Sequence, residues 1–289
     1  MGRLFWINAA LLVLVVALAL FAYFRPPTAA PEYRLSTLKP ADVKNIKIES
    51  GGAPIVLERG AAEWKITAPL TARADKFQVQ RILAVLGAAA KERLPATDLA
   101  RFDLAPPPLR LTIDGQTFDF GMINELTREQ YILTQYHVYL SKPGYGMALP
   151  RNVWQLIGRQ LFAENETPIA FQFPDFTLAQ HDGKWTLSPS LKTELSQDDF
   201  NRWIDDWRYA SALSVQPAEK RPATATIEVK LQDGRMLKLA VLQRAPQLVL
   251  ARDDQPAFEY QFTADAAQQL LTPPGTTLKP RINTDEEHR

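Results

Sequence analysis

One short pattern occurs twice in this chain of 289 residues, and it constrains the fold more than any other feature. Trp64 stands in "EWKITAP", where Pro69 ends an alternating run of polar and apolar residues. Trp185 and Pro189 stand in the same relation in "KWTLSPS". Such alternation predicts a half-buried strand. Because the two tryptophans lie 121 residues apart, the pattern predicts two copies of one unit, with these four residues as equivalent structural positions.

A helix is predicted after each of these strands, again at matching positions. Apolar residues recur there at the i, i+3, i+4, i+7 spacing of one helix face. The two stripes are Val79, Ile82, Leu83 and Leu86 in the first copy, and Phe200, Trp203, Ile204 and Trp207 in the second. Asp75 with Gln78, and Ser196 with Asp199, have the spacing of N-terminal helix caps.

Hairpins are predicted downstream of both helices. Asp114-Gly115 and Asp233-Gly234 each separate two alternating runs, and Asp-Gly is a strong signal for a tight turn. A second strand pair follows at 130–140 and at 247–262, and short closing helices are predicted at 151–161 and 264–271. Each copy therefore reads as strands, one long helix, more strands and a short helix.

We expect an α+β fold from this order of elements. An N-terminal transmembrane helix would precede two copies of a strand–strand–strand–helix–strand-rich–short-helix unit with antiparallel or mixed sheets. The expected segments are an anchor (1–24), a tether (25–42), repeat 1 (43–161), repeat 2 (162–272) and a flexible tail (273–289). Whether the repeats lie in line or around a pseudo-twofold axis is left open.

The first residues of the chain predict a membrane anchor. Residues 4–24 are almost entirely apolar, and as a helix they would span about 30 Å, the thickness of a hydrocarbon core. The alternative is a signal peptide cleaved after Ala30, although its apolar region would normally have only about 7–15 residues. We expect an uncleaved single-pass anchor that contacts the lipid bilayer through residues 4–24. The location would be the inner membrane, with the bulk of the chain in the periplasm.

Composition argues against several classes of function. The chain has no cysteine, which excludes disulfides and thiolate sites, and 33 basic against 32 acidic residues argue against nucleic acid as a partner. His137, His181 and His288 show no metal-ligand spacing. We therefore expect no catalytic residue, no metal and no cofactor, and a protein that is not an enzyme.

Two features allow an alternative chemical interpretation. The pairs Asp198-Asp199, Asp205-Asp206 and Asp253-Asp254 could supply acid–base catalysis, but caps, turns and solvated faces explain them better. The aromatic residues of "FNRWIDDWRY" (200–209) could stack on a sugar, although core packing explains their helical spacing. A cell-wall or glycan hydrolase that uses Asp198, Asp199, Asp205 and Asp206 is the least favoured function.

One predicted hairpin is unusually rich in polar and aromatic side chains. Tyr and Arg are frequent in binding surfaces, and an ordinary exposed hairpin is the alternative. The residues of this possible interaction surface are Arg128, Tyr131, Gln135, Tyr136, His137 and Tyr139.

A longer pattern covers most of the region from about Asn45 to Leu140 and, more faintly, the second copy. It contains a Gly-x-x-x-Trp-x-apolar-x-x-Pro motif, Ala74-Asp75 at the helix start, "RFDLAPPPLRLTI", a strand ending in Gly121 and "YIL…VYL". This order resembles a bacterial family of membrane-anchored proteins with duplicated α+β repeats, known only as a domain of unknown function. Asp103 stands where that family tends to have glycine. Some members lie near gliding-motility and ABC-transporter auxiliary components, and the resemblance implies no catalytic residue.

These observations favour a non-enzymatic, membrane-anchored periplasmic protein. It would act as an interaction or scaffold component of a cell-envelope assembly, with other envelope proteins as partners. The main alternative is an accessory subunit of an ABC-type transporter, whose partner would be the permease.

Overall fold

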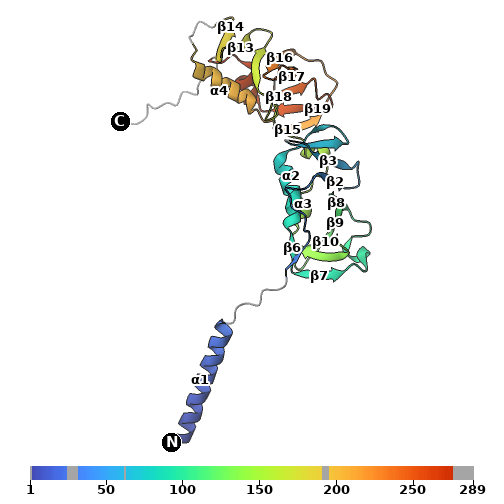
Figure 1. Ribbon diagram of the computed structural model, residues 1–289, viewed down its shortest axis with the longest axis vertical. Coiled ribbons are helices and arrows are strands. Elements are labelled where there is room, and N and C mark those ends of the chain that lie inside the picture. Colours follow the sequence, from blue (N-terminus) through green and yellow to red (C-terminus); the bar gives the residue numbers. More distant parts are fainter. Residues whose placement is uncertain (1, 25–31, 62, 191–194, 276–289) are drawn as a thin grey trace, which may run out of the picture.

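The computed structural model describes residues 2–24, 32–61, 63–190 and 195–275 (Figure 1). Within these residues, nineteen strands form three antiparallel sheets of two, nine and eight strands, and five helices accompany them. The expected α+β class is therefore corrected to a mostly β fold. The helical stripes are present, but α2 (Lys76–Leu83) has only 8 residues and α4 (Gln197–Arg208) only 12, so sheet dominates each unit.

The first large sheet has the strand order β5-β4-β3-β2-β8-β9-β10-β11-β7, and each neighbouring pair is antiparallel. Its strands are β2 (Asn45–Glu49), β3 (Ile55–Arg59), β4 (Trp64–Ala68), β5 (Ala72–Arg73), β7 (Glu92–Pro95), β8 (Leu109–Ile113), β9 (Gln116–Ile123), β10 (Gln130–Thr134) and β11 (His137–Ser141). The apolar stripe of α2 and of the 3₁₀ helix η1 (Ala84–Gly87) is buried in the core of this unit. A second 3₁₀ helix, η2 (Leu99–Phe102), lies between β7 and β8.

The second large sheet has the order β14-β13-β12-β16-β17-β18-β19-β15, again antiparallel throughout. Its strands are β12 (Pro168–Gln172), β13 (Thr177–His181), β14 (Lys184–Ser188), β15 (Ser214–Pro217), β16 (Ala225–Leu231), β17 (Met236–Gln243), β18 (Leu248–Arg252) and β19 (Phe258–Phe262). If the two-residue strand β5 is left out, both sheets follow one order, from β4 or β14 at one edge to β7 or β15 at the other. Both also have a register irregularity between the strand after the Asp-Gly turn and the next strand.

The repeated tryptophans and prolines occupy similar places in the two sheets. Trp64 is 9% exposed and Trp185 is 5% exposed, and both belong to the hydrophobic core. Pro69 and Pro189 come directly after β4 and β14, and each follows a cis peptide bond. The division into repeats at 43–161 and 162–272 remains our interpretation of this order.

The expected tether is partly folded. β1 (Tyr33–Arg34) pairs with β6 (Ala89–Ala90) in the two-stranded sheet, and Leu35 is fully buried. The tether boundary at residue 42 is therefore wrong, because strands of two residues give no periodic signal in the sequence. Residues 25–31 of the tether, the possible cleavage site after Ala30, and residues 276–289 of the tail with His288 lie outside the described residues.

The short helix expected at 151–161 is also corrected. Only the 3₁₀ helix η3 (Val153–Gln155) forms there, and α3 (Gly144–Met147) lies upstream of it. From Ile157 onwards the backbone pairs with other segments, since Gly158 donates its N–H to the carbonyl oxygen of Arg73. In the second unit, α5 (Ala264–Leu271) forms where the second short helix was expected.

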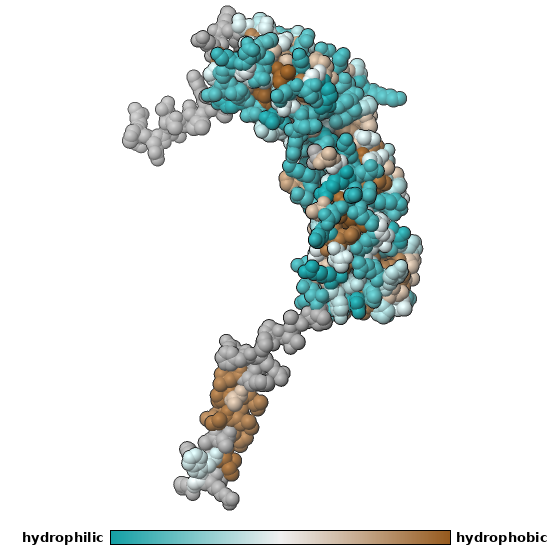
Figure 2. All heavy atoms as spheres, viewed as in Figure 1, coloured by the Kyte–Doolittle hydropathy of each residue, from teal (hydrophilic) through white to brown (hydrophobic). Residues whose placement is uncertain are grey.

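The N-terminal helix α1 runs from Gly2 to Phe24. Its longest run of described side chains, from Leu11 to Leu20, covers about 15 Å of helix. Figure 2 shows apolar residues along this helix, whereas the visible face of the sheet units is largely polar. Among the described residues, no helix is long and apolar enough to cross a membrane, and the transmembrane element of the expected fold class is corrected accordingly.

Candidate binding cleft

The two sheet units are joined by a chain segment that pairs with both of them. On the side of the first unit, Gly158 N–H donates to Arg73 O (2.8 Å). On the side of the second unit, Leu161 N–H donates to Ala210 O (3.0 Å) and Ala212 N–H donates to Arg159 O (2.9 Å). Residues 158–161 therefore fix the edge of the second sheet close to the start of α2.

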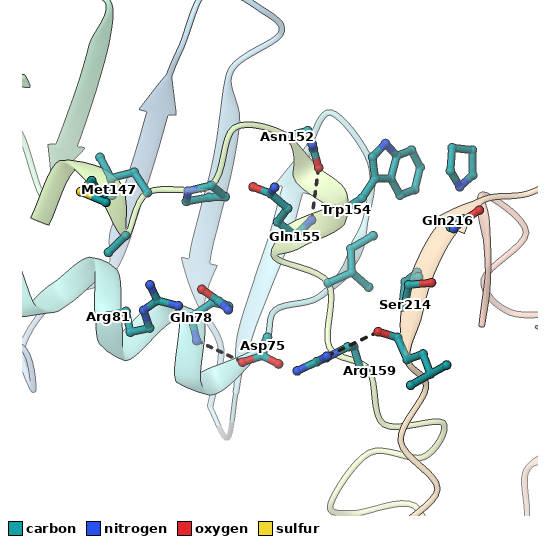
Figure 3. Close-up of a pocket in the computed structure, with 17 residues that line it drawn as sticks. Asp75, Gln78, Arg81, Met147, Asn152, Trp154, Gln155, Arg159, Ser214 and Gln216 are labelled. Carbon is teal, nitrogen blue, oxygen red and sulfur yellow. Dashed lines mark hydrogen bonds between the residues drawn. The ribbon is translucent and has the colours of Figure 1, made fainter. Parts of the chain in front are cut away.

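A cavity of about 620 Å³ lies at this junction (Figure 3). Its volume is within the range of about 300–1,000 Å³ that is usual for ligand sites. Three separate parts of the chain form its walls. They are α2 with its N-terminal cap (Asp75, Gln78, Arg81), the segment from α3 to Arg159 (Met147, Ala148, Leu149, Pro150, Asn152, Trp154, Gln155, Ile157, Arg159) and the stretch Leu213, Ser214, Val215, Gln216, Pro217. We call this cavity the junction cleft.

One wall of the junction cleft is a sheet edge. β15 is the last strand in the order of its sheet, and it pairs with β19 on one side. All four of its residues line the cleft, and η3 lies close by on the other side. The edge of a strand carries backbone N–H and C=O groups that can pair with another extended segment.

The charge of the cleft is set by two arginines. Arg81 and Arg159 are exposed, and within the described residues neither has a carboxylate at ion-pair distance. Arg159 Nη1 donates only to the carbonyl oxygen of Leu213, at 3.4 Å. The single carboxylate in the lining is Asp75, whose Oδ1 accepts the N–H groups of Phe77 and Gln78 as the cap of α2. The cleft thus combines a positive charge with apolar and amide side chains.

The six residues of the expected interaction surface do not lie together, and none lines the junction cleft. Tyr139 is 4% exposed and belongs to the core, in the strand β11 that is paired with β10 and β7 and buried from Val138 to Ser141. Tyr131 is half-buried and packs against Phe102, with ring centroids 4.5 Å apart. Its hydroxyl oxygen accepts a hydrogen bond from Asn124 Nδ2 (2.8 Å).

Of the other four members of that set, three lie in two different turns and His137 is the first residue of β11. Gln135 and Tyr136 form the turn between β10 and β11, both with positive φ, and Tyr136 is 91% exposed. His137 is half-buried, with Nδ1 3.0 Å from Gln135 O. Arg128 lies in the turn between β9 and β10 and also has a positive φ. Of the six residues, Arg128, Gln135 and Tyr136 are exposed, in the turns at the two ends of β10, and a binding role for the set stays a prediction.

The carboxylates of α4 lie outside the cleft. Asp198 and Asp199 are in its first turn, and Asp199 completes a capping box with Ser196, which lowers the pKa of Asp199. Asp205 and Asp206 are exposed at the surface. Partial burial and the charge of Asp205 raise the pKa of Asp206. Nothing in this arrangement brings two carboxylates to opposite sides of a substrate site.

The remaining polar candidates have local structural contacts. Asp253 accepts the N–H of Lys238 (3.1 Å), and Asp254 pairs with Arg252 (2.8 Å). His181 is exposed at the end of β13. The described residues contain no group of three or more His, Asp or Glu side chains that could hold a metal ion.

The aromatic residues of α4 are part of the core. Trp203 and Trp207 pack against Phe171 at centroid distances of 5.3 and 5.2 Å. Their indole N–H groups donate to Thr272 O and Leu270 O, at the end of α5. This packing removes Phe200, Trp203 and Trp207 from any surface on which a sugar could stack, whereas Tyr209, after the end of α4, is 68% exposed.

Sequence reasoning did not identify the residues of the junction cleft. Asp75 was identified only as a helix cap, Arg81 and Arg159 stand in segments predicted only as helices, and Gln216 stands in a segment without a motif. No local signal could have found them, because the cleft forms only where three segments meet.

Comparisons with known proteins identify a family but no described function. A family model described as a domain of unknown function (DUF4340) matches residues 64–234, more than half of the chain. The match begins at Trp64 and ends at Gly234, in the second Asp-Gly turn. No curated protein and no solved structure matches the chain. The match carries no information on anchoring, repeats, gliding motility or transport.

Proposed function

We propose that this chain, which belongs to the DUF4340 family of domains of unknown function, is a non-enzymatic interaction component of a cell-envelope assembly. The observation that carries the proposal is the junction cleft, where the edge strand β15 and two arginines that have no carboxylate partner among the described residues line a cavity of about 620 Å³. Its only carboxylate already serves as a helix cap. Such a lining favours binding of a partner over acid–base chemistry.

The location is part of the same proposal. Large apolar side chains of α1 are exposed along the helix, among them Leu12, Val13 and Leu18 at 58–68%. Exposed contiguous apolar surface is typical of a membrane or protein contact. We therefore place the protein at the inner membrane, with residues 4–24 in contact with lipid and the sheet units in the periplasm.

The two alternative functions receive less support. A glycan hydrolase would need its carboxylates in a cleft, whereas Asp198, Asp199, Asp205 and Asp206 lie on α4 away from the junction cleft. An accessory role beside an ABC permease is a special case of the proposed function. It would be recognised by the identity of the partner.

Crosslinking in living cells tests the proposal. A photoreactive phenylalanine would replace Leu213 or Met147, which line the cleft and are 53% and 72% exposed. Matched controls are Met236 and Tyr209, which are 54% and 68% exposed and do not line the cleft. We expect a defined crosslinked partner at the two cleft positions, identified by mass spectrometry, and none at the controls.

The proposal would be contradicted if all four positions gave the same products, or if only copies of this chain and abundant porins were captured. A permease captured at the cleft positions would identify the assembly as a transporter. Any other envelope protein captured there would support the scaffold role.

A further inference from the structure

The chain itself pairs with the first part of the cleft's sheet edge. Residues 159–161 run antiparallel to 210–212, with a bridge between Gln160 and Ser211. At Gly158 the backbone turns away and bonds to Arg73 instead. From Leu213 onwards, the same edge continues as β15 into the cleft without a further strand in the described part of the chain. Along this edge, residues 210–212 are paired with 159–161, whereas the following strand β15 has no further strand beside it among the described residues.

The free stretch has the length of a short peptide contact. β15 comprises four residues, or about 13 Å at ~3.3 Å per residue. Pro217 ends it, because proline has no N–H to offer a further strand. The cavity of about 620 Å³ lies along this edge. An extended segment of three or four residues fits this dimension.

The opposite edge of the same sheet, β14, is covered by a side chain at one residue, Trp185, unlike the β15 edge. At the β14 edge, the side-chain amide of Gln197 accepts the N–H of Trp185 (2.8 Å) and donates to its carbonyl oxygen (3.0 Å). Such covering is one way in which proteins protect sheet edges from pairing. The β15 edge instead faces a cavity.

The charges of the cleft indicate what kind of segment would bind. The guanidinium groups of Arg81 and Arg159 stand on the two sides of the cleft floor, on α2 and on the joining segment (Figure 3). Neither has a carboxylate partner among the described residues, and guanidinium groups bind carboxylates through paired hydrogen bonds. A neutral glycan would supply no anion, although Trp154 and the amides would tolerate a sugar. Charge complementarity therefore favours an acidic peptide.

We propose that the occupant of the junction cleft is an extended acidic peptide segment of a partner protein, which adds as a strand to β15. The inference rests on the proposed function and specifies its partner. Main-chain hydrogen bonds to the β15 edge would provide affinity, and Arg81 and Arg159 would select an Asp or Glu side chain or a C-terminal carboxylate. Side chains at alternate peptide positions would point into the cleft.

A peptide selection experiment tests this inference on the full chain in detergent micelles. A random heptapeptide display library is the probe, and the enriched peptide is synthesised with a fluorescent label for anisotropy. We expect acidic peptides, and Arg81→Glu or Arg159→Glu should each weaken binding about tenfold. Arg208→Glu, an exposed site on α4 outside the cleft, should leave binding within about twofold. Equal melting temperatures would show that the variants fold.

Backbone methylation tests the strand geometry directly. N-methylation of single peptide bonds should abolish binding at alternate positions, where the N–H faces β15, and have little effect at the positions between. Strand addition would be overturned if N-methylation weakened binding equally at every peptide position, or at none. The acidic specificity would be overturned if the library yielded basic or neutral peptides, or if Arg81→Glu and Arg159→Glu both left peptide binding unchanged.

The outcomes separate this inference from the proposed function. Crosslinked partners at Leu213 and Met147 without any enriched peptide would overturn strand addition but leave the interaction role in place. Binding of purified peptidoglycan fragments without peptide enrichment would overturn the inference in favour of a glycan ligand. Absence of both crosslinks and peptides would contradict the two proposals together.

Discussion

At the scale of single residues, the repeated motif serves packing and backbone geometry. Trp64 begins β4 and Trp185 stands in β14, and both side chains are core members. Arg59 lies over the ring of Trp64, with its guanidinium carbon 5.3 Å from the ring centroid. Asp103 has a φ of 58°, at the position where the resembled family tends to have glycine. Aspartate tolerates this left-handed conformation better than most residues, so the departure is compatible with the fold.

Replacement of either tryptophan should therefore cost stability. We expect Trp64→Ala and Trp185→Ala each to lower the free energy of unfolding by about 3–5 kcal/mol, because a large buried side chain is lost and a cavity remains. Urea unfolding followed by circular dichroism would measure the change. Tyr136→Ala, at a site that is 91% exposed, is the control and should change it by less than about 0.5 kcal/mol. Unchanged midpoints for both tryptophan variants would refute the packing role.

At the scale of elements, α2 and α4 each begin with a side-chain cap that the sequence predicts. Asp75 accepts the N–H groups of Phe77 and Gln78, and Ser196 with Asp199 forms a complete capping box. These bonds satisfy N–H groups that have no partner within a helix. They fix where α2 and α4 begin, and in the first unit they also fix the floor of the junction cleft.

The cap of α2 gives a prediction with a matched control. Asp75→Ala should destabilise the protein by about 0.5–2 kcal/mol, because two N–H groups lose their acceptor. Asp75→Asn retains an acceptor oxygen and should stay close to the original stability. Thermal and urea unfolding of the three proteins would show the order. Equal losses for Ala and Asn would mean that the carboxylate charge, and not the cap, is responsible.

At the scale of the whole molecule, the two sheet units lie one after the other and are connected through residues 158–161 (Figure 1). Leu161 is fully buried and Phe162 is 3% exposed, so this part of the joining segment belongs to the core. Arg252, itself buried, donates to Leu161 O and to both carboxylate oxygens of Glu166. A buried ion pair of this kind contributes most when all its hydrogen bonds are made. These bonds hold the end of the joining segment, Leu161 and Glu166, against β18 of the second sheet.

Acid should weaken this junction. Burial alone would raise the pKa of Glu166, but the hydrogen bonds and charge of Arg252 outweigh it and lower the pKa from 4.5 to about 2. A carboxylate with a lowered pKa stabilises the fold above its unfolded pKa, and this contribution is lost as pH falls from about 4.5 to about 2. The loss should amount to about 3 kcal/mol at most.

Urea unfolding between pH 6 and pH 2.5 would measure this loss. Glu166→Gln should flatten the acid slope relative to the original protein, since its amide does not titrate. The control is Asp253→Asn, because Asp253 is an exposed carboxylate next to Arg252 in the sequence. This variant should keep the acid slope of the original protein. Parallel pH profiles for the original protein and Glu166→Gln would contradict the assigned role of Glu166.

The sequence predicted strands and helices where a long periodic signal exists. The stripes of α2 and α4, the Asp-Gly hairpins and the last short helix all have such signals. β1, β5 and β6 have two residues each, too few for a period to be read. The helix expected at 151–161 failed because tertiary pairing of Gly158 and Leu161 competes with local helix formation. The fold class was wrong because the helices are short beside sheets of nine and eight strands.

By itself, the sequence determined the repeated order of strand, helix and hairpin, since period, caps and turn residues act over a few neighbouring positions. It also predicted the burial of Trp64 and Trp185 through the alternation around them, and that of Trp203 and Trp207 through their helical spacing. Only the tertiary structure decided the strand order of the sheets, the burial of Tyr139 and the existence of the junction cleft. These features depend on contacts between segments that lie tens of residues apart. Arg81, Arg159 and the edge of β15 line one cavity only because the folded chain brings the two units together.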